Sequence, residues 1–112
     1  MKPPTVVTDS AGADCQLDGV TQGRVSWSQV REVAVEVVVS ANFVYSEALW
    51  QLSGEGDDFV VPVELIVGAD EFNVALFALP GFDHEAYRLA RVAEAASCKA
   101  RFVCWKRGKV TE

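Results

Sequence analysis

The sequence of 112 residues lacks a long hydrophobic run. Its richest apolar segment, residues 33–39, carries Glu36 in its middle and is far shorter than the ~20 apolar residues of a membrane-spanning helix. The first seven residues contain no unbroken apolar stretch of the kind that a secretory signal needs. We therefore expect no membrane segment and a cytoplasmic location.

Cysteine and histidine are scarce. Cys15, Cys98 and Cys104 form no C-x-x-C pair, and His84 is the single histidine. Structural zinc normally takes four ligands at short paired spacings, so this set does not predict a zinc site. Without an export signal the thiols should stay reduced. We expect no metal and no cofactor.

Motifs for catalysis and nucleotide binding are also missing. No serine stands in a G-x-S-x-G elbow, and the glycines form neither G-x-G-x-x-G nor a P-loop. His84 follows Asp83, the expected N-cap of a helix, and is most simply a first-turn residue that faces water. A small hydrolase or transferase that uses Asp83, His84 and a cysteine is the weakest hypothesis, and we expect a protein that is not an enzyme.

The charge is unbalanced, with sixteen Asp and Glu against ten Lys and Arg and a net charge of −6. This charge repels phosphate-rich partners on average, so nucleic acid is disfavoured. It would speed the approach of a basic protein. Basic residues nevertheless concentrate near the C-terminal end, at 99, 101, 106, 107 and 109. A solvated edge strand explains them, since lysine on an edge discourages aggregation, and a binding patch is the alternative.

Apolar periodicity predicts both strands and helices. Alternation of period two favours strands, which we expect at residues 15–17, 24–27, 30–39, 47–53, 59–65 and 100–107. Pro62 marks its strand as an edge or bulged strand because proline donates no ladder hydrogen bond. In the last strand, Phe102 and Cys104 should share one face, and Val103 and Trp105 the other.

Two helices should precede that last strand. The first is about ten residues long, capped by Asp70 and ended by Pro80 and Gly81. The second begins at its N-cap Asp83 and reaches about residue 97. Its inward face is predicted to hold four apolar residues, Leu89, Val92, Ala93 and Ala96, with Glu85, Arg88, Arg91 and Glu94 outward.

The element order is then β-β-β-β-β-α-α-β. It predicts an α+β domain with one antiparallel sheet of about five to six strands and two consecutive helices before the C-terminal strand. A strongly bent, pleckstrin-homology-like sheet is one version of this order. We expect a flexible lead-in over residues 1–13, a single domain over 14–108 and a tail over 109–112.

Two groups are candidate partner-binding residues. Trp105 lies between Arg101 and Arg107, and if it stands on the outer face of its strand, this mixture of aromatic and arginine is typical of binding hot spots. Asp57 and Asp58 form an acidic pair in an expected hairpin turn. The pair lacks calcium-loop spacing, so protein contact or a plain turn are the alternatives.

Several segments resemble a family of small bacterial proteins, most specifically LPGFD at 79–83 and RFVCW at 101–105. The resemblance covers roughly residues 20–107 and implies a coherent fold rather than a particular activity. In size and charge the chain is also similar to immunity proteins that neutralise toxins. We expect a non-enzymatic protein-binding domain, an immunity protein or a regulator that binds a basic partner. A homo-oligomer that pairs through an edge strand such as residues 59–67 is the alternative.

Overall fold

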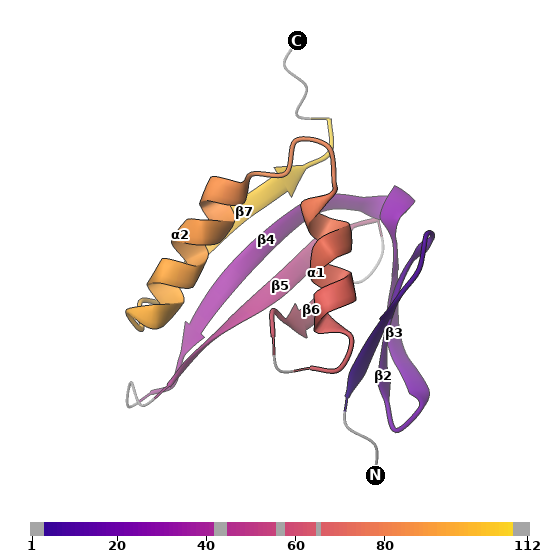
Figure 1. Ribbon diagram of the computed structural model, residues 1–112, viewed down its shortest axis with the longest axis horizontal. Coiled ribbons are helices and arrows are strands. Elements are labelled where there is room, and N and C mark those ends of the chain that lie inside the picture. Colours follow the sequence, from indigo (N-terminus) through magenta and orange to yellow (C-terminus); the bar gives the residue numbers. More distant parts are fainter. Residues whose placement is uncertain (1–3, 42–44, 56–57, 65, 109–112) are drawn as a thin grey trace.

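The computed structural model describes residues 4–41, 45–55, 58–64 and 66–108. These residues form an α+β fold, as predicted (Figure 1). The strands before the helices are β1 (Thr5–Thr8), β2 (Gly12–Leu17), β3 (Val20–Ser26), β4 (Val30–Val39), β5 (Ser46–Gly54) and β6 (Phe59–Pro62). A short 3-10 helix, η1 (Trp27–Gln29), separates β3 from β4. Helices α1 (Ala69–Phe77) and α2 (His84–Ala95) follow, and β7 (Ala100–Lys106) closes the order.

Within the described residues the strands divide between two antiparallel sheets. One has the order β1-β2-β3 and the other β6-β5-β4-β7. The prediction of one sheet and of five strands before the helices is therefore wrong, and no pleckstrin-homology-like sheet is seen. The physical reason lies at η1, which redirects the chain between β3 and β4, so that these consecutive strands do not pair with each other. β6 is an edge strand, as Pro62 predicted.

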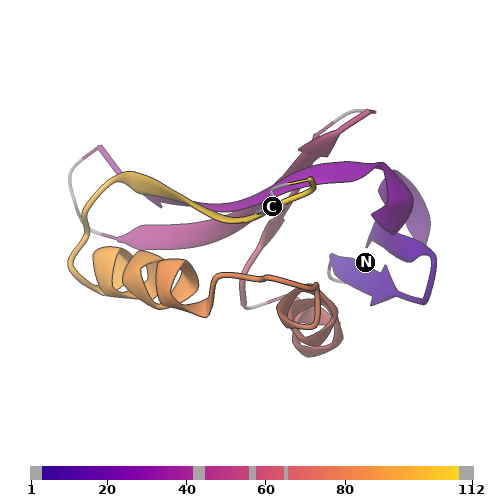
Figure 2. The same cartoon turned by 90° about the horizontal axis from the view of Figure 1, so that it is seen from above.

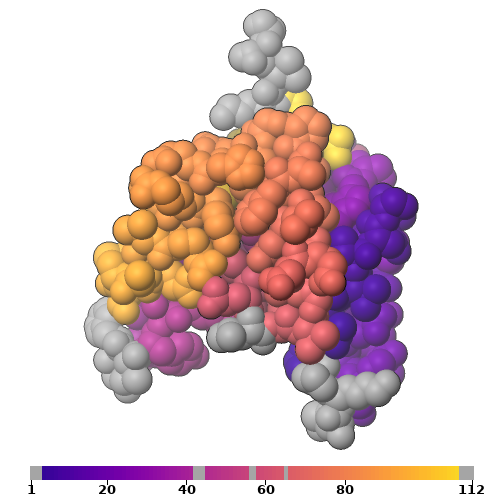
Figure 3. All heavy atoms as spheres, in the orientation of Figure 1, coloured from indigo at the N-terminus to yellow at the C-terminus, as the bar shows by residue number. Residues whose placement is uncertain are grey.

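The two helices lie on one face of the four-stranded sheet, and the three-stranded sheet stands beside α1 (Figures 1 and 2). Seen from the helix side, their side chains cover most of that face (Figure 3). The opposite face carries no described element (Figure 2).

The core lies between the four-stranded sheet and the helices. The predicted alternation is confirmed on β4 and β5, whose buried side chains include Val33, Val35, Ala48, Trp50 and Leu52. Trp50 is fully buried, and its indole N–H donates to Asn73 Oδ1 at 2.7 Å. Its ring stacks on Tyr87 of α2, with 5.4 Å between the ring centroids. Trp50 thus joins β5 to both helices.

The described part of the segment expected to be a flexible lead-in, residues 4–13, contains β1 and the beginning of β2. Val6 is buried, and its backbone N–H donates to Val67 O at 2.8 Å. The Asp9 side chain closes the turn between the two strands by accepting hydrogen bonds from the backbone N–H groups of Ala11 and Gly12. The composition misleads because a hairpin turn uses the same Ser, Gly and Asp residues as a linker.

Gly68, not Asp70, is the N-cap of α1. Gly68 has φ +89°, a left-handed conformation that favours glycine, and a Cβ atom there would lie 1.9 Å from Val6 O. The helix therefore begins where β1 passes against it, a contact that local sequence does not reveal. Asp70 instead lies in the first turn of the helix.

Asp83 caps α2 as predicted, since its side chain accepts a hydrogen bond from Ala86 N at 3.0 Å. The predicted inward face of α2 is wrong. Leu89 and Val92 are 40% and 53% exposed, while Ala90 is fully buried. The stacking of Tyr87 on Trp50 turns the helix so that a different stripe faces the sheet. Ala93 is only partly buried and Ala96 is exposed.

Candidate protein-binding face

The uncovered face of the four-stranded sheet, called the open face below, is built from side chains that alternate with the core residues. Two neighbouring rows run across the strands in register. One row holds Val60, Gln51, Ala34 and Val103. The next holds Pro62, Leu49, Glu36 and Arg101.

Apolar side chains are unusually frequent on the open face. An antiparallel sheet with one solvated face normally places polar residues on it. Here Val60 is 50% and Val103 is 38% exposed, and Leu49, Val38 and Pro62 are half-buried. The face therefore leaves apolar surface in water on a rigid framework of backbone hydrogen bonds.

Arg101, a predicted binding residue, lies on the open face opposite Glu36 of β4. Its guanidinium donates to Glu32 Oε2 at 2.6 Å and to Gln51 Oε1 at 3.1 Å. The Arg101 side chain remains 42% exposed, and an ion pair at such exposure stabilises by less than ~1 kcal/mol. These contacts thus hold Arg101 in position while its side chain stays accessible on the surface.

Acidic side chains outnumber basic ones on the open face. Glu32 is matched by Arg101 and, at 4.0 Å, by Lys106. Glu36 and Glu47 make no ion pair among the described residues. The local charge therefore has the same sign as that of the whole chain.

Trp105 and Arg107 lie together, but they are not on the open face. The ladder between β4 and β7 is irregular at Cys104, where one extra residue is accommodated. Trp105 consequently packs against the core side, as Phe102 and Cys104 do. The prediction that Val103 and Trp105 share a face is wrong for this reason.

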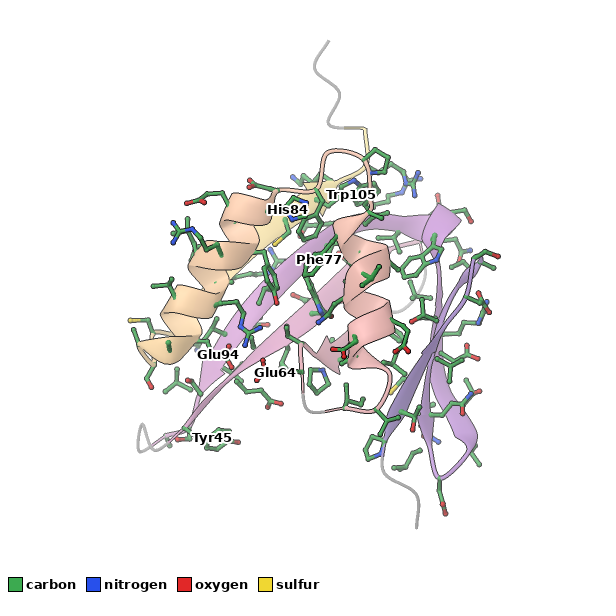
Figure 4. All side chains as sticks on the ribbon, viewed as in Figure 1. Tyr45, Glu64, Phe77, His84, Glu94 and Trp105 are labelled. Atoms are coloured by element: carbon green, nitrogen blue, oxygen red, sulfur yellow. The ribbon has the colours of Figure 1, made fainter. Side chains whose placement is uncertain are left out.

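Trp105 is fixed by polar contacts at the loop between the helices (Figure 4). Its indole N–H donates to Pro80 O at 2.8 Å. The Arg107 guanidinium carbon lies 5.2 Å from the centroid of the Trp105 ring. Arg107 also donates to the carbonyl oxygens of Trp27 and Val30, both at 2.7 Å. The described contacts of Arg107 join β7 to the start of β4.

The acidic candidates are separated from these residues. Asp58 directly precedes β6 and is exposed, and β6 forms the sheet edge opposite β7. Asp57 lies outside the described residues. The structure therefore does not bring Asp58 and Arg101 into one cluster.

A groove at the far end of α2 gathers Tyr45, Glu64 and Glu94 (Figure 4). Both carboxylates bind Arg91, whose guanidinium also donates to the Tyr87 hydroxyl at 2.9 Å. Burial alone would lower the pKa of Arg91, but the hydrogen bonds to Tyr87 and Glu64 raise it above its ordinary value. Glu64 and Glu94 are therefore already paired with Arg91.

The residues considered for catalysis lie near Trp105. Burial raises the pKa of the Cys104 thiol to about 12, and the Asp83 carboxylate acts in the same direction. The thiol thus stays protonated at neutral pH and is a poor nucleophile. His84 is exposed and packs its ring against Phe82 and Phe77, at 4.9 and 5.7 Å between centroids (Figure 4).

The described residues hold neither a metal-binding cluster nor a helix able to cross a membrane. They contain no group of three or more His, Cys, Asp or Glu side chains arranged to hold a metal ion. No described helix combines the length and the apolar character needed to cross a membrane.

The sequence analysis named Arg101 as a candidate but did not single out the apolar residues of the open face. The signal was present, because Leu49 interrupts the alternation of β5 and both faces of β7 carry apolar residues. These interruptions coincide in space only after the strands are placed in register. The open face is therefore defined by how β4 to β7 pair in the sheet, and no single segment of the sequence reveals it.

The fold and this face together define a small α+β protein with helices on one face of its larger sheet. Comparisons with protein-family models, with curated proteins and with solved structures find no match to the chain.

Proposed function

We propose that this chain is a non-enzymatic protein-binding domain that holds its partner on the open face. The observation that carries the proposal is the apolar surface formed by Val60, Pro62 and Leu49, which are neighbours on β6 and β5, with the exposed Val103 on the opposite edge strand. Contiguous apolar surface with a polar surround is typical of protein interaction sites. Arg101 adds a residue type that is enriched at binding hot spots.

The electrostatics favour a basic partner. The net charge of −6 and the excess of carboxylates on the open face would speed the approach of a positively charged protein. An immunity protein or a regulator that blocks such a partner needs a binding face and no catalytic group. A rigid sheet suits this role because little backbone freedom is lost on binding.

The test compares two double variants that differ only in where the charge is placed. Val60→Asp/Val103→Asp alters the open face, and the control Val7→Asp/Val20→Asp alters exposed valines of the three-stranded sheet, which are 45% and 62% exposed. Each bait is immobilised and used for quantitative affinity capture from the lysate of the native host. Thermal unfolding first establishes that all three proteins are folded.

The expected result is a basic protein retained by the wild type and by the control but lost with the open-face variant. Retention by the open-face variant would contradict the proposal, as would equal loss with the control. Capture of no protein by the folded wild type would also count against it. Sedimentation of the same samples detects the alternative, self-association through the open face.

A further inference from the structure

A stripe of exposed apolar side chains runs along α2. Leu89 and Val92 are both exposed, and the exposed Ala96 follows them on the same side of the helix, because residues three and four apart share one helix face. Ala90 is fully buried on the sheet side of α2. The packing of the core therefore fixes the rotation of the helix and holds the stripe in water.

The spacing of the stripe suits the pairing of helices. Leu89, Val92 and Ala96 are separated by three and four residues, the alternation that forms the seam between paired helices. Ala86 and Ala93 lie beside the stripe, toward the sheet. Small residues next to a seam let two helix axes approach to about 8–10 Å. A second helix can therefore lie along α2 in close contact.

The charge of α2 differs from that of the rest of this acidic chain. α2 contains two glutamates and two arginines, so its acidic and basic side chains balance. The net charge of the chain is −6, and α1 holds two acidic residues and no basic one. A second copy of the chain therefore meets less repulsion at α2 than at α1 or at the open face. A basic partner gains no attraction at α2.

The two ends of α2 carry opposite charge. Asp83 caps the beginning and Glu85 lies in the first turn, whereas Lys99 follows the end. Neither Asp83 nor Lys99 makes an ion pair among the described residues. Glu85 pairs with Arg88, but both side chains are more than half exposed, and such a surface pair contributes little. An antiparallel second copy would bring Lys99 to the acidic beginning of its partner, whereas a parallel copy would bring like charges together.

We infer that this stripe is a docking site for a second copy of the chain, with the two α2 helices packed antiparallel about a two-fold axis. Leu89 of each copy then contacts Val92 of the other, and Ala96 lies beside Glu85 of the other copy. The helices lie on one face of the four-stranded sheet and the open face is the other (Figure 2). The dimer therefore leaves both open faces free, and the inference does not depend on the proposed function.

Sedimentation equilibrium of the full chain, at concentrations up to about 1 mM, tests the dimer, because a contact between two helices of twelve residues is smaller than a standard interface and binds weakly. The wild type should dimerise, and Leu89→Glu/Val92→Glu should weaken dimerisation about tenfold or more. The control Val20→Glu/Val74→Glu makes the same change of charge at more exposed valines and should weaken it much less. Thermal unfolding first establishes that all variants are folded. A wild type that stays monomeric, or equal weakening by both variants, would overturn the inference.

Charge reversal tests the antiparallel orientation. Glu85→Lys and Lys99→Glu should each weaken the dimer about threefold or more, because each places like charges at both ends of the contact. The double variant Glu85→Lys/Lys99→Glu restores opposite charges between the copies and should recover the wild-type affinity. Unchanged affinity in the single variants, or no recovery in the double variant, would overturn the antiparallel arrangement.

NMR spectra recorded over the same concentrations locate the contact. Backbone amide shifts that depend on concentration should centre on residues 85–96. The open-face variant Val60→Asp/Val103→Asp should still dimerise, which separates the dimer from the proposed function. Shifts confined to β5 and β6, or loss of the dimer in the open-face variant, would show self-association through the open face and overturn the inference.

Discussion

The two sheets of this protein are both antiparallel and valine-rich, yet they bury different amounts of their side chains. β4 and β5 place Val33, Val35 and Trp50 at full burial. The three-stranded sheet leaves Val7 and Val20 exposed. Strand formation therefore does not by itself indicate a contribution to the core, and we expect stability to follow burial.

Contacts between the three-stranded sheet and the rest of the molecule are concentrated near its edges. Trp27 stacks on Phe72 of α1, with 6.0 Å between the ring centroids, and β1 donates to Val67 O. Trp27 also donates its indole N–H to Asp9 O at 3.1 Å. These contacts tie a largely exposed sheet to the core, so local loosening of β1–β3 should cost less than loosening of β4–β5.

The largest expected difference comes from shortening one side chain in each sheet. Trp50→Ala should destabilise by about 3–5 kcal/mol, because it removes a buried ring and leaves a cavity. Val20→Ala should change stability by less than about 0.5 kcal/mol at its exposed site. Urea unfolding followed by far-UV circular dichroism measures both. Similar losses of unfolding free energy in the two variants would contradict the contrast between the sheets. If Trp50→Ala does not fold, Trp50→Phe takes its place in the comparison.

The junction between the regions can be tested at Gly68. Gly68→Ala forces a side chain into left-handed backbone, which costs about 1–2 kcal/mol, and its Cβ would meet Val6 O. Gly19→Ala is the control, because Gly19 has φ +82° with no atom within 4 Å of the added Cβ. Gly68→Ala should therefore be the more destabilising, with faster hydrogen exchange in β1. Equal effects would show that the close approach of β1 is unimportant.

A contrast between local and distant contacts explains which features the sequence predicts correctly. The alternation of β4 and β5 and the Asp83 cap depend on neighbours along the chain, and both are confirmed. The inward face of α2 depends on the stacking of Tyr87 on Trp50, a contact between distant segments. Local periodicity favoured Leu89 and Val92 because they are the larger apolar residues, but tertiary packing placed Ala90 inward.

The candidate site shows the same limit. Arg101 and Trp105 both belong to β7. Strict alternation of side chains along this strand would place both on the same face of the sheet. The irregularity at Cys104 appears only in the pairing with β4 and separates the two side chains. The sequence therefore indicated which residue types could bind, while register decided which of them share a surface.

The smallest expected effect concerns acid sensitivity of the turn between β1 and β2. Hydrogen bonds from Ala11 N and Gly12 N lower the pKa of Asp9 below its ordinary value of 3.8, and the nearby Arg24 acts in the same direction. Because the pKa is lowered in the folded state, the stabilisation by the carboxylate is present above that value and is lost as the pH falls through the folded pKa.

Asp9→Asn keeps a side-chain oxygen acceptor but removes this titration. Hydrogen exchange at the amides of β1 and β2, measured between pH 6 and pH 3 and corrected for intrinsic rates, should show a weaker acid-induced loss of protection than in the wild type. The amides of β4 and β5 serve as the internal control and should respond equally in both proteins. If β1 and β2 lose protection in acid equally in the variant and the wild type, the Asp9 carboxylate does not contribute to their stability. If the variant also changes the acid response of β4 and β5, the two sheets unfold as one unit.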